Sequence, residues 1–207
     1  MKKLKGFTLI ELIVVIAIVG VLAALLVPTL IGYVRKSKIT AINSNASNAF
    51  KAVNSALTEL SNEGADMDDC IYITHAIGST TVVSNQTILL ADGTSADDLL
   101  FKKIKGFFGG AVNITFKAYV IDNTCKILVA NTDSEFCGTY PGNVVTTDNY
   151  KNSGYHAESP RTSTDYCDDV AANVIAKHYS DTLTINNGQL SYICLLYTSP
   201  SPRDGAT

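Results

Sequence analysis

The sequence contains few of the residues from which active sites are built. It has three histidines, His75, His156 and His178, and they fall in three separate segments. It contains no GxSxG segment, no P-loop and no G-x-G-x-x-G segment. The CxxC and His-x-x-x-His spacings of zinc sites are also missing. The sequence offers no group of an acid, a base and a nucleophile. We therefore expect a protein that is not an enzyme and that holds no metal ion or cofactor.

Charge is sparse as well. Only 17% of the residues are charged, and the formal net charge is −3, so the basic surplus of a nucleic-acid-binding protein is missing. Asp165, Asp168 and Asp169 are most simply first-turn acids of a helix, with a calcium site as the alternative. No internal repeat of 20–50 residues occurs, so the 207 residues suffice for a long helix and one ordinary domain.

The most distinctive stretch is the apolar run Phe7–Ile31, in which Glu11 is the only ionisable residue. At about 1.5 Å per residue, such a helix covers the roughly 30 Å hydrocarbon core of a bilayer. A cleaved secretory signal fits poorly, because the apolar region of such signals spans about 7–15 residues, whereas the run here has 25. A single-pass anchor fits, and Lys2, Lys3 and Lys5 predict a cytoplasmic N-terminus by the positive-inside rule.

A plain anchor does not explain Glu11. An acid in a spanning helix costs on the order of a few kcal/mol, so it indicates a function and requires a partner. If the chain were cut after Gly6, the new amine of Phe7 would lie one helical turn before Glu11. We therefore expect the carboxylate of Glu11 to pair with this ammonium group, within one subunit or between neighbours.

The segment Gly6-Phe7-Thr8-Leu9-Ile10-Glu11, preceded by lysines and followed by an apolar run with Pro28, resembles the N-terminal signature of type IV pilins and pseudopilins. The resemblance implies cleavage after Gly6 by a prepilin peptidase, methylation of Phe7, and a role for Glu11 in assembly. It also implies an inner-membrane assembly platform and a homo-oligomeric helical filament. Pro28 is expected to bend the helix, since proline removes an i to i−4 hydrogen bond.

Beyond the apolar run, residues 33–60 keep a helical period with a thinner apolar stripe, and Gly64 can cap the helix end. We therefore divide the chain into a leader (1–6), a membrane and assembly helix (7–31), an amphipathic continuation (32–64) and a β-rich extracellular domain (65–193). Strands are predicted at 71–75, 80–83 and 87–91, in a hairpin of 113–121 with 126–130, and in a second hairpin of 182–185 with 189–193. Helices are predicted at 95–105 and 168–179, and residues 132–164, rich in Gly, Asn, Asp, Ser and Tyr, are predicted to form an extended loop region.

This order predicts an α+β fold, in which one long N-terminal helix packs on a mostly antiparallel sheet. The resemblance to pilins implies the same arrangement. Its functional expectation is a pilus subunit that is anchored in the cell membrane before assembly and lies in an extracellular filament afterwards. The alternative is a pseudopilin of a type II secretion or DNA-uptake system.

The C-terminal segment 194–204, CLLYTSPSPRD, resembles the translation of a sequencing adaptor of the transposase type. We therefore expect residues 194–207 to be a sequence artefact, with a Pro/Ser-rich tail as the alternative. Four cysteines then remain, Cys70, Cys125, Cys137 and Cys167, and they allow two disulfides with three connectivities. Cys125 and Cys137 are close enough in sequence to close a small loop, which would leave Cys70 with Cys167; unpaired thiols are the alternative.

Overall fold

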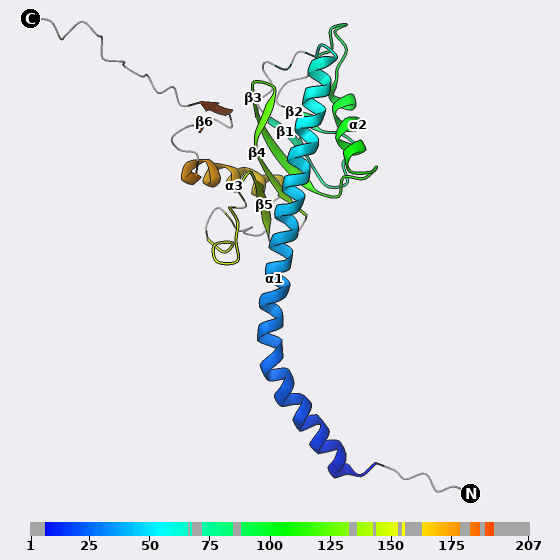
Figure 1. Cartoon of the computed structure of the whole chain (residues 1–207), viewed down its shortest axis with the longest axis vertical. Coiled ribbons are helices and arrows are strands. Elements are labelled where there is room, and N and C mark those ends of the chain that lie inside the picture. The colour runs from blue at the N-terminus through cyan, green and yellow to red at the C-terminus, as the bar shows by residue number, and fades with distance from the viewer. Residues whose placement is uncertain are drawn as a thin grey trace, which may run out of the picture.

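A computed structural model of the chain describes residues 7–65, 67, 72–84, 88–132, 136–142, 144–152, 155, 163–178, 183–186 and 189–192. The leader, Gly6, Cys70 and residues 194–207 lie outside this part of the chain. The structure consists of one long helix and a domain that packs along the upper half of that helix (Figure 1). The α+β fold predicted from the sequence is confirmed.

The long helix, α1 (Leu9–Asn62), has 54 residues, which correspond to about 80 Å at 1.5 Å per residue. It continues through Pro28 without a break, and its N-terminal part is inclined to its upper part (Figure 1). Its first buried residue is Ile39 and its last is Leu60. The helix ends at Asn62, and Gly64 follows with φ of 80°. This left-handed conformation is the one predicted for Gly64.

The main sheet has five antiparallel strands in the order β2-β1-β3-β4-β5. They are β1 (Tyr72–His75), β2 (Val83–Ser84), β3 (Thr115–Ile121), β4 (Thr124–Asn131) and β5 (Cys137–Tyr140). Asp122 and Asn123 join β3 to β4 with φ of 50° and 56°, as a two-residue hairpin turn requires. The predicted central hairpin is therefore confirmed, and it lies in the middle of the sheet.

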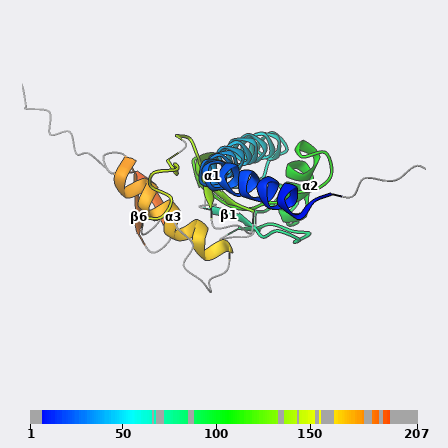
Figure 2. The same ribbon diagram turned by 90° about the horizontal axis from the view of Figure 1, so that it is seen from below.

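Three helices cover this sheet and its edges (Figure 2). α1 packs on β4 and β5, α2 (Asp97–Phe107) packs on α1, and α3 (Ser163–His178) packs on β3 and β4. Six consecutive residues of β3 are buried. Since consecutive side chains of a strand point to opposite faces, both faces of β3 are covered. The strands β6 (Leu183–Asn186) and β7 (Gln189–Tyr192) form a separate hairpin.

Three expectations about strands were wrong. The strand expected at 80–83 includes residues 80–82, but β2 begins only at Val83. β5 lies in a stretch rich in Gly, Asn, Asp and Tyr that we interpreted as a loop region. Residues 87–91 were expected to form a strand, but their described part contributes only an isolated bridge between Leu89 and Ser95. The peptide group between Ile42 and Asn43 of α1 lies directly against Gly138 of β5. This tertiary contact holds β5 in place within a stretch that is rich in turn-forming residues.

Candidate functional site

The N-terminal half of α1 has no packing partner within the part of the chain that the structure describes. Every residue from Phe7 to Val34 is exposed, and nineteen of these side chains are large and hydrophobic. Within the described residues, α1 is the one helix that is long and apolar enough to cross a membrane. Exposed apolar surface of this extent marks a site of interaction with lipid or with other protein.

Glu11 lies near the start of this surface, and the Thr8 N–H and hydroxyl both donate to its carboxylate. The Thr8 N–H donates to Oε2 of Glu11 over 2.8 Å, and the Thr8 hydroxyl donates to the same oxygen over 2.7 Å. In return, the Glu11 N–H donates to Oγ1 of Thr8 over 3.4 Å. This reciprocal pattern is a capping box, in which the two side chains satisfy backbone groups that the helix start leaves unpaired.

We expected Glu11 to pair with the amine of Phe7 and did not predict its hydrogen bonds with Thr8. The Thr-x-x-Glu spacing is itself a sequence signature of a helix start, so the signal was present. Phe7 lies just before the cap, with 81% of its side chain exposed. Neither the cleavage at Gly6 nor the methylation of Phe7 is tested by this geometry, and both stay predictions, as does a bend caused by Pro28.

Two asparagines attach the upper half of α1 to the sheet. Asn43 is buried; its side-chain amide donates to the Val145 carbonyl over 3.1 Å, and its Oδ1 accepts from the Thr139 N–H over 3.0 Å. Asn54 bonds both backbone groups of Cys125, accepting from its N–H over 2.9 Å and donating to its carbonyl over 3.5 Å. The amphipathic pattern predicted the packed face, but not these hydrogen bonds.

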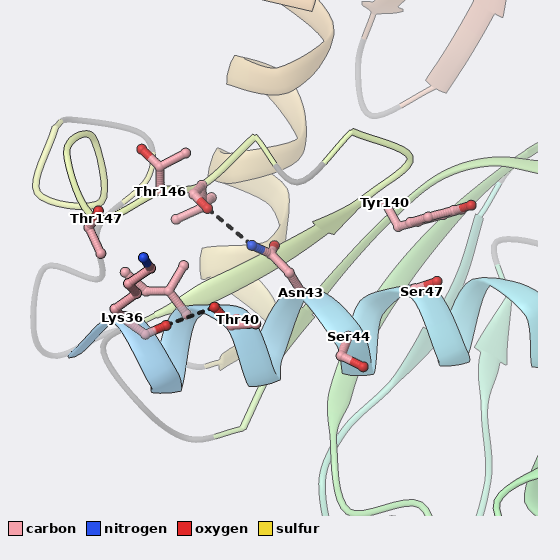
Figure 3. Close-up of a pocket in the computed structure, with 10 residues that line it drawn as sticks. Lys36, Thr40, Asn43, Ser44, Ser47, Tyr140, Thr146 and Thr147 are labelled. Atoms are coloured by element: carbon pink, nitrogen blue, oxygen red, sulfur yellow. Dashed lines mark hydrogen bonds between the residues drawn. The ribbon is translucent and has the colours of Figure 1, made fainter. Parts of the chain in front are cut away.

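A groove, which we name the hydroxyl groove, runs along one side of this joint (Figure 3). Its volume is about 480 Å³. It is lined on α1 by Lys36, Ile39, Thr40, Asn43, Ser44 and Ser47, and opposite α1 by Tyr140, Val145, Thr146 and Thr147. Six of these ten described residues carry a hydroxyl group, and Lys36 is the only acidic or basic residue among the ten. No acid–base pair with a nucleophile lies in this groove. Among the described residues, no three His, Cys, Asp or Glu side chains are placed to hold a metal ion.

The suggested pairing of Cys125 with Cys137 was wrong. Cys137 lies opposite Asn131 in the register of β4 and β5, and Asn131 is six residues from Cys125 along β4, or roughly 20 Å. A disulfide requires Cα atoms about 4.4–6.8 Å apart. Cys125, Cys137 and Cys167 are all buried, and burial raises the pKa of the Cys137 thiol to about 11. Pairings that involve Cys70 concern a residue outside the described part.

Comparison with known proteins links this geometry to a family. A family described as "Prokaryotic N-terminal methylation motif" matches residues 1–27. The type IV major alpha-pilin of Moraxella bovis is 41% identical over 86 residues, which are 39% of this chain and 54% of that protein. The type IV wide pilus major component PilA4 of Thermus thermophilus is 30% identical over 112 residues, which are 54% of this chain and 80% of that protein. The chain belongs to the type IV pilin family.

The curated relatives match only part of this pilin. A fimbrial protein of Pseudomonas aeruginosa is 44% identical, but over only 59 residues, or 28% of the pilin and 38% of that protein. The chain spans about half the length, or less, of the first curated relatives that it matches. No solved structure matches the pilin. The family therefore rests on sequence, and the long helix packed on an antiparallel sheet agrees with it.

Proposed function

We propose that this pilin is a structural subunit of an extracellular type IV pilus and that its N-terminal helix holds the filament together. The observation that carries the proposal is the exposed apolar half of α1, from Phe7 to Val34. Leaving a large apolar side chain in water costs about 1.5–3 kcal/mol, so nineteen of them require cover. Lipid provides that cover before assembly, and the helices of other subunits provide it afterwards.

The proposed precursor spans the cell membrane once, with the lysine-rich leader in the cytoplasm and the domain from β1 to β7 outside. A prepilin peptidase removes the leader after Gly6, and Phe7 is methylated. Removal of Lys2, Lys3 and Lys5 changes the formal side-chain charge from −3 to −6. An inner-membrane assembly platform then receives the subunit. The role is structural rather than enzymatic.

Glu11 is suited to direct this assembly because of how its two oxygens are used. Both hydrogen bonds from Thr8 end on Oε2, so Oε1 is left to accept from the N-terminal ammonium group of a cleaved subunit. The capping box thus orients the carboxylate, and the charge of the carboxylate attracts the amine. Burial of an unpaired charge in an apolar bundle is costly, so a subunit without this pairing is disfavoured.

A pseudopilin is the second candidate, and the comparisons favour a pilus subunit over it. The relatives described above carry names of pilins, fimbrial proteins and a pilus component.

Mass spectrometry of filaments sheared from the cell surface tests the proposal. We expect intact subunits that begin at N-methylated Phe7 and that lack residues 1–6. Full-length protein that retains the leader and stays in the membrane fraction would contradict it and would indicate a plain anchor.

Two variants at Glu11 separate the charge from the helix cap. Glu11→Ala removes both, whereas Glu11→Gln keeps an acceptor for Thr8, because glutamine also serves in a capping box. We expect leader cleavage in both variants and a loss of filament yield in both. Normal yield with Glu11→Gln would show that the cap, and not the charge, is what assembly requires.

A further inference from the structure

A second, smaller groove lies where the apolar half of α1 meets the outer domain. It is lined by Leu30, Ile31, Val34, Arg35, Lys38 and Phe136 and has a volume of about 260 Å³; we name it the interfacial groove. Its lowest residues belong to the end of the apolar run, and its highest, Lys38, precedes the first buried residue of α1. If α1 spans a bilayer, the groove therefore lies at the level of the outer headgroups.

One wall of the interfacial groove is apolar. Leu30, Ile31 and Val34 are 62%, 53% and 48% exposed on α1, and they form consecutive turns of one helix face. Opposite them lies Phe136, which is buried and packs on Tyr150 with ring centroids 5.1 Å apart. A flexible hydrocarbon chain fits such a surface, because contact with it removes apolar area from water.

Two cations lie at the upper end of the same groove. The guanidinium carbon of Arg35 lies 5.2 Å from the ring centre of Tyr150, a cation–π contact that restrains this side chain. Lys38 is exposed. The ion pairs among the described residues are those of Lys103 with Glu59 and Glu63. Neither Arg35 nor Lys38 forms an ion pair with an acid in this part of the chain. The groove thus combines an apolar wall with two positive charges on its outer side.

We propose that the interfacial groove binds an anionic phospholipid while the subunit is in the membrane. One acyl chain lies against Leu30, Ile31, Val34 and Phe136, and the phosphate is bound by Arg35 and Lys38. The arrangement matches the polarity of such a lipid from tail to headgroup, and basic residues next to a spanning helix attract anionic lipids. The inference rests on the membrane stage of the proposed function.

A second copy of the chain at the same depth is a poorer occupant. Arg35 and Lys38 would require an acid from the neighbouring helix, and Glu11 is the only acid in the apolar run. It lies 24 residues before Arg35, or about 36 Å along α1. A lipid supplies its negative charge at the depth where the two cations lie.

The test uses the full-length protein in nanodiscs of three parts phosphatidylcholine to one part phosphatidylglycerol. Native mass spectrometry of the released protein counts the lipids that it retains. We expect wild-type protein to retain phosphatidylglycerol in preference to phosphatidylcholine, and Lys38→Gln to reduce that retention about tenfold, the effect of losing one hydrogen bond to a charged group.

Lys36→Gln is the matched control. Lys36 lies in the same helical turn as Lys38 and at a similar depth. Because the two positions are two residues apart, their side chains point about 200° apart around α1, and Lys36 lines the hydroxyl groove (Figure 3). We expect this variant to retain phosphatidylglycerol as wild type does. Val34→Trp tests the apolar wall: it fills the groove, keeps both cations and should displace the lipid. Tyr33→Trp should not, because Tyr33 lies about 100° from Val34 around α1 and does not line the groove.

The outcomes separate this inference from the proposed function. Failure of the wild-type protein to enter nanodiscs would contradict the membrane stage itself. Entry without any preference between the two lipids would overturn the lipid site alone. Equal losses from Lys36→Gln and Lys38→Gln, or a second copy of the chain retained in place of the lipid, would also overturn it. Near-ultraviolet circular dichroism of each variant verifies that the outer domain remains folded.

Discussion

Gly138 offers the sharpest test of how the sheet is joined to α1. It lies in β5, where the strand backbone approaches the helix backbone directly. A Cβ atom at this position would overlap the carbonyl group of Ile42 and lie 2.7 Å from the backbone nitrogen of Asn43. These neighbours are main-chain atoms within a continuous helix, so they cannot rotate away as a side chain could. Gly138→Ala therefore forces β5 and α1 apart.

The expected cost has two parts. Overpacking of a closely packed contact costs about 1–3 kcal/mol. Separation also stretches the two hydrogen bonds of Asn43, to the Thr139 N–H and to the Val145 carbonyl, each worth about 0.5–1.5 kcal/mol. The sum is about 2–6 kcal/mol, and for a domain of this size it lowers Tm by on the order of 10 °C.

The assay is thermal unfolding of the full-length protein in detergent, followed by circular dichroism of the tyrosines. Gly106→Ala is the matched control. Gly106 lies in α2 with no atom within 4 Å of its added Cβ, and alanine is better than glycine in a helix by about 0.5–1 kcal/mol. The same substitution should thus raise Tm at position 106 and lower it at position 138. An unchanged or raised Tm for Gly138→Ala would refute the close backbone contact between β5 and α1.

Three further predictions concern individual side chains. Asn43→Ala should lower the free energy of unfolding by about 2–4 kcal/mol, since it leaves two buried backbone groups unpaired; an unchanged urea midpoint would contradict this. Bonds from Lys103 to Glu63 and Glu59 raise the pKa of Lys103, so their stabilisation is present at neutral pH and lost as pH rises above about 10.5. The Tm difference between wild type and Lys103→Met should therefore shrink in that range, and a constant difference would count against the ion pairs. Because burial raises the pKa of Cys137 to about 11, its thiol should resist iodoacetamide at pH 8 in the folded protein, and peptide mapping that finds rapid alkylation would show the site to be open.

Helices and the central hairpin were predictable because their signals are local. The period of apolar residues extends along α1, and the alternation in β3 and β4 surrounds a recognisable turn. β5 was not predictable, because it has only four residues, contains Gly138 and lies in a stretch rich in Gly, Asn and Asp, and the strand packs directly on α1. The error over Cys125 and Cys137 has a similar cause: separation along the chain does not reveal that Cys125 lies near the start of β4 whereas Cys137 lies beside its far end.

At the candidate site, the sequence indicated Glu11 because an acid in an apolar run is costly. It did not indicate how the carboxylate is held, although Thr8 stands at the spacing of a capping box. The interfacial groove could not be predicted, because Phe136 is far from α1 in sequence and only the folded domain brings it beside Val34 and Arg35.

The two asparagine attachments have a mechanical consequence. Asn43 and Asn54 lie 11 residues apart, or about 16 Å along α1, and each bonds the backbone of a different strand. A joint fixed at one point allows rotation about that point, whereas a joint fixed at two points resists both rotation and axial sliding. Tension along a filament of such subunits would run through the helices, and each outer domain would keep its angle and height on its own helix while the load passes beside it.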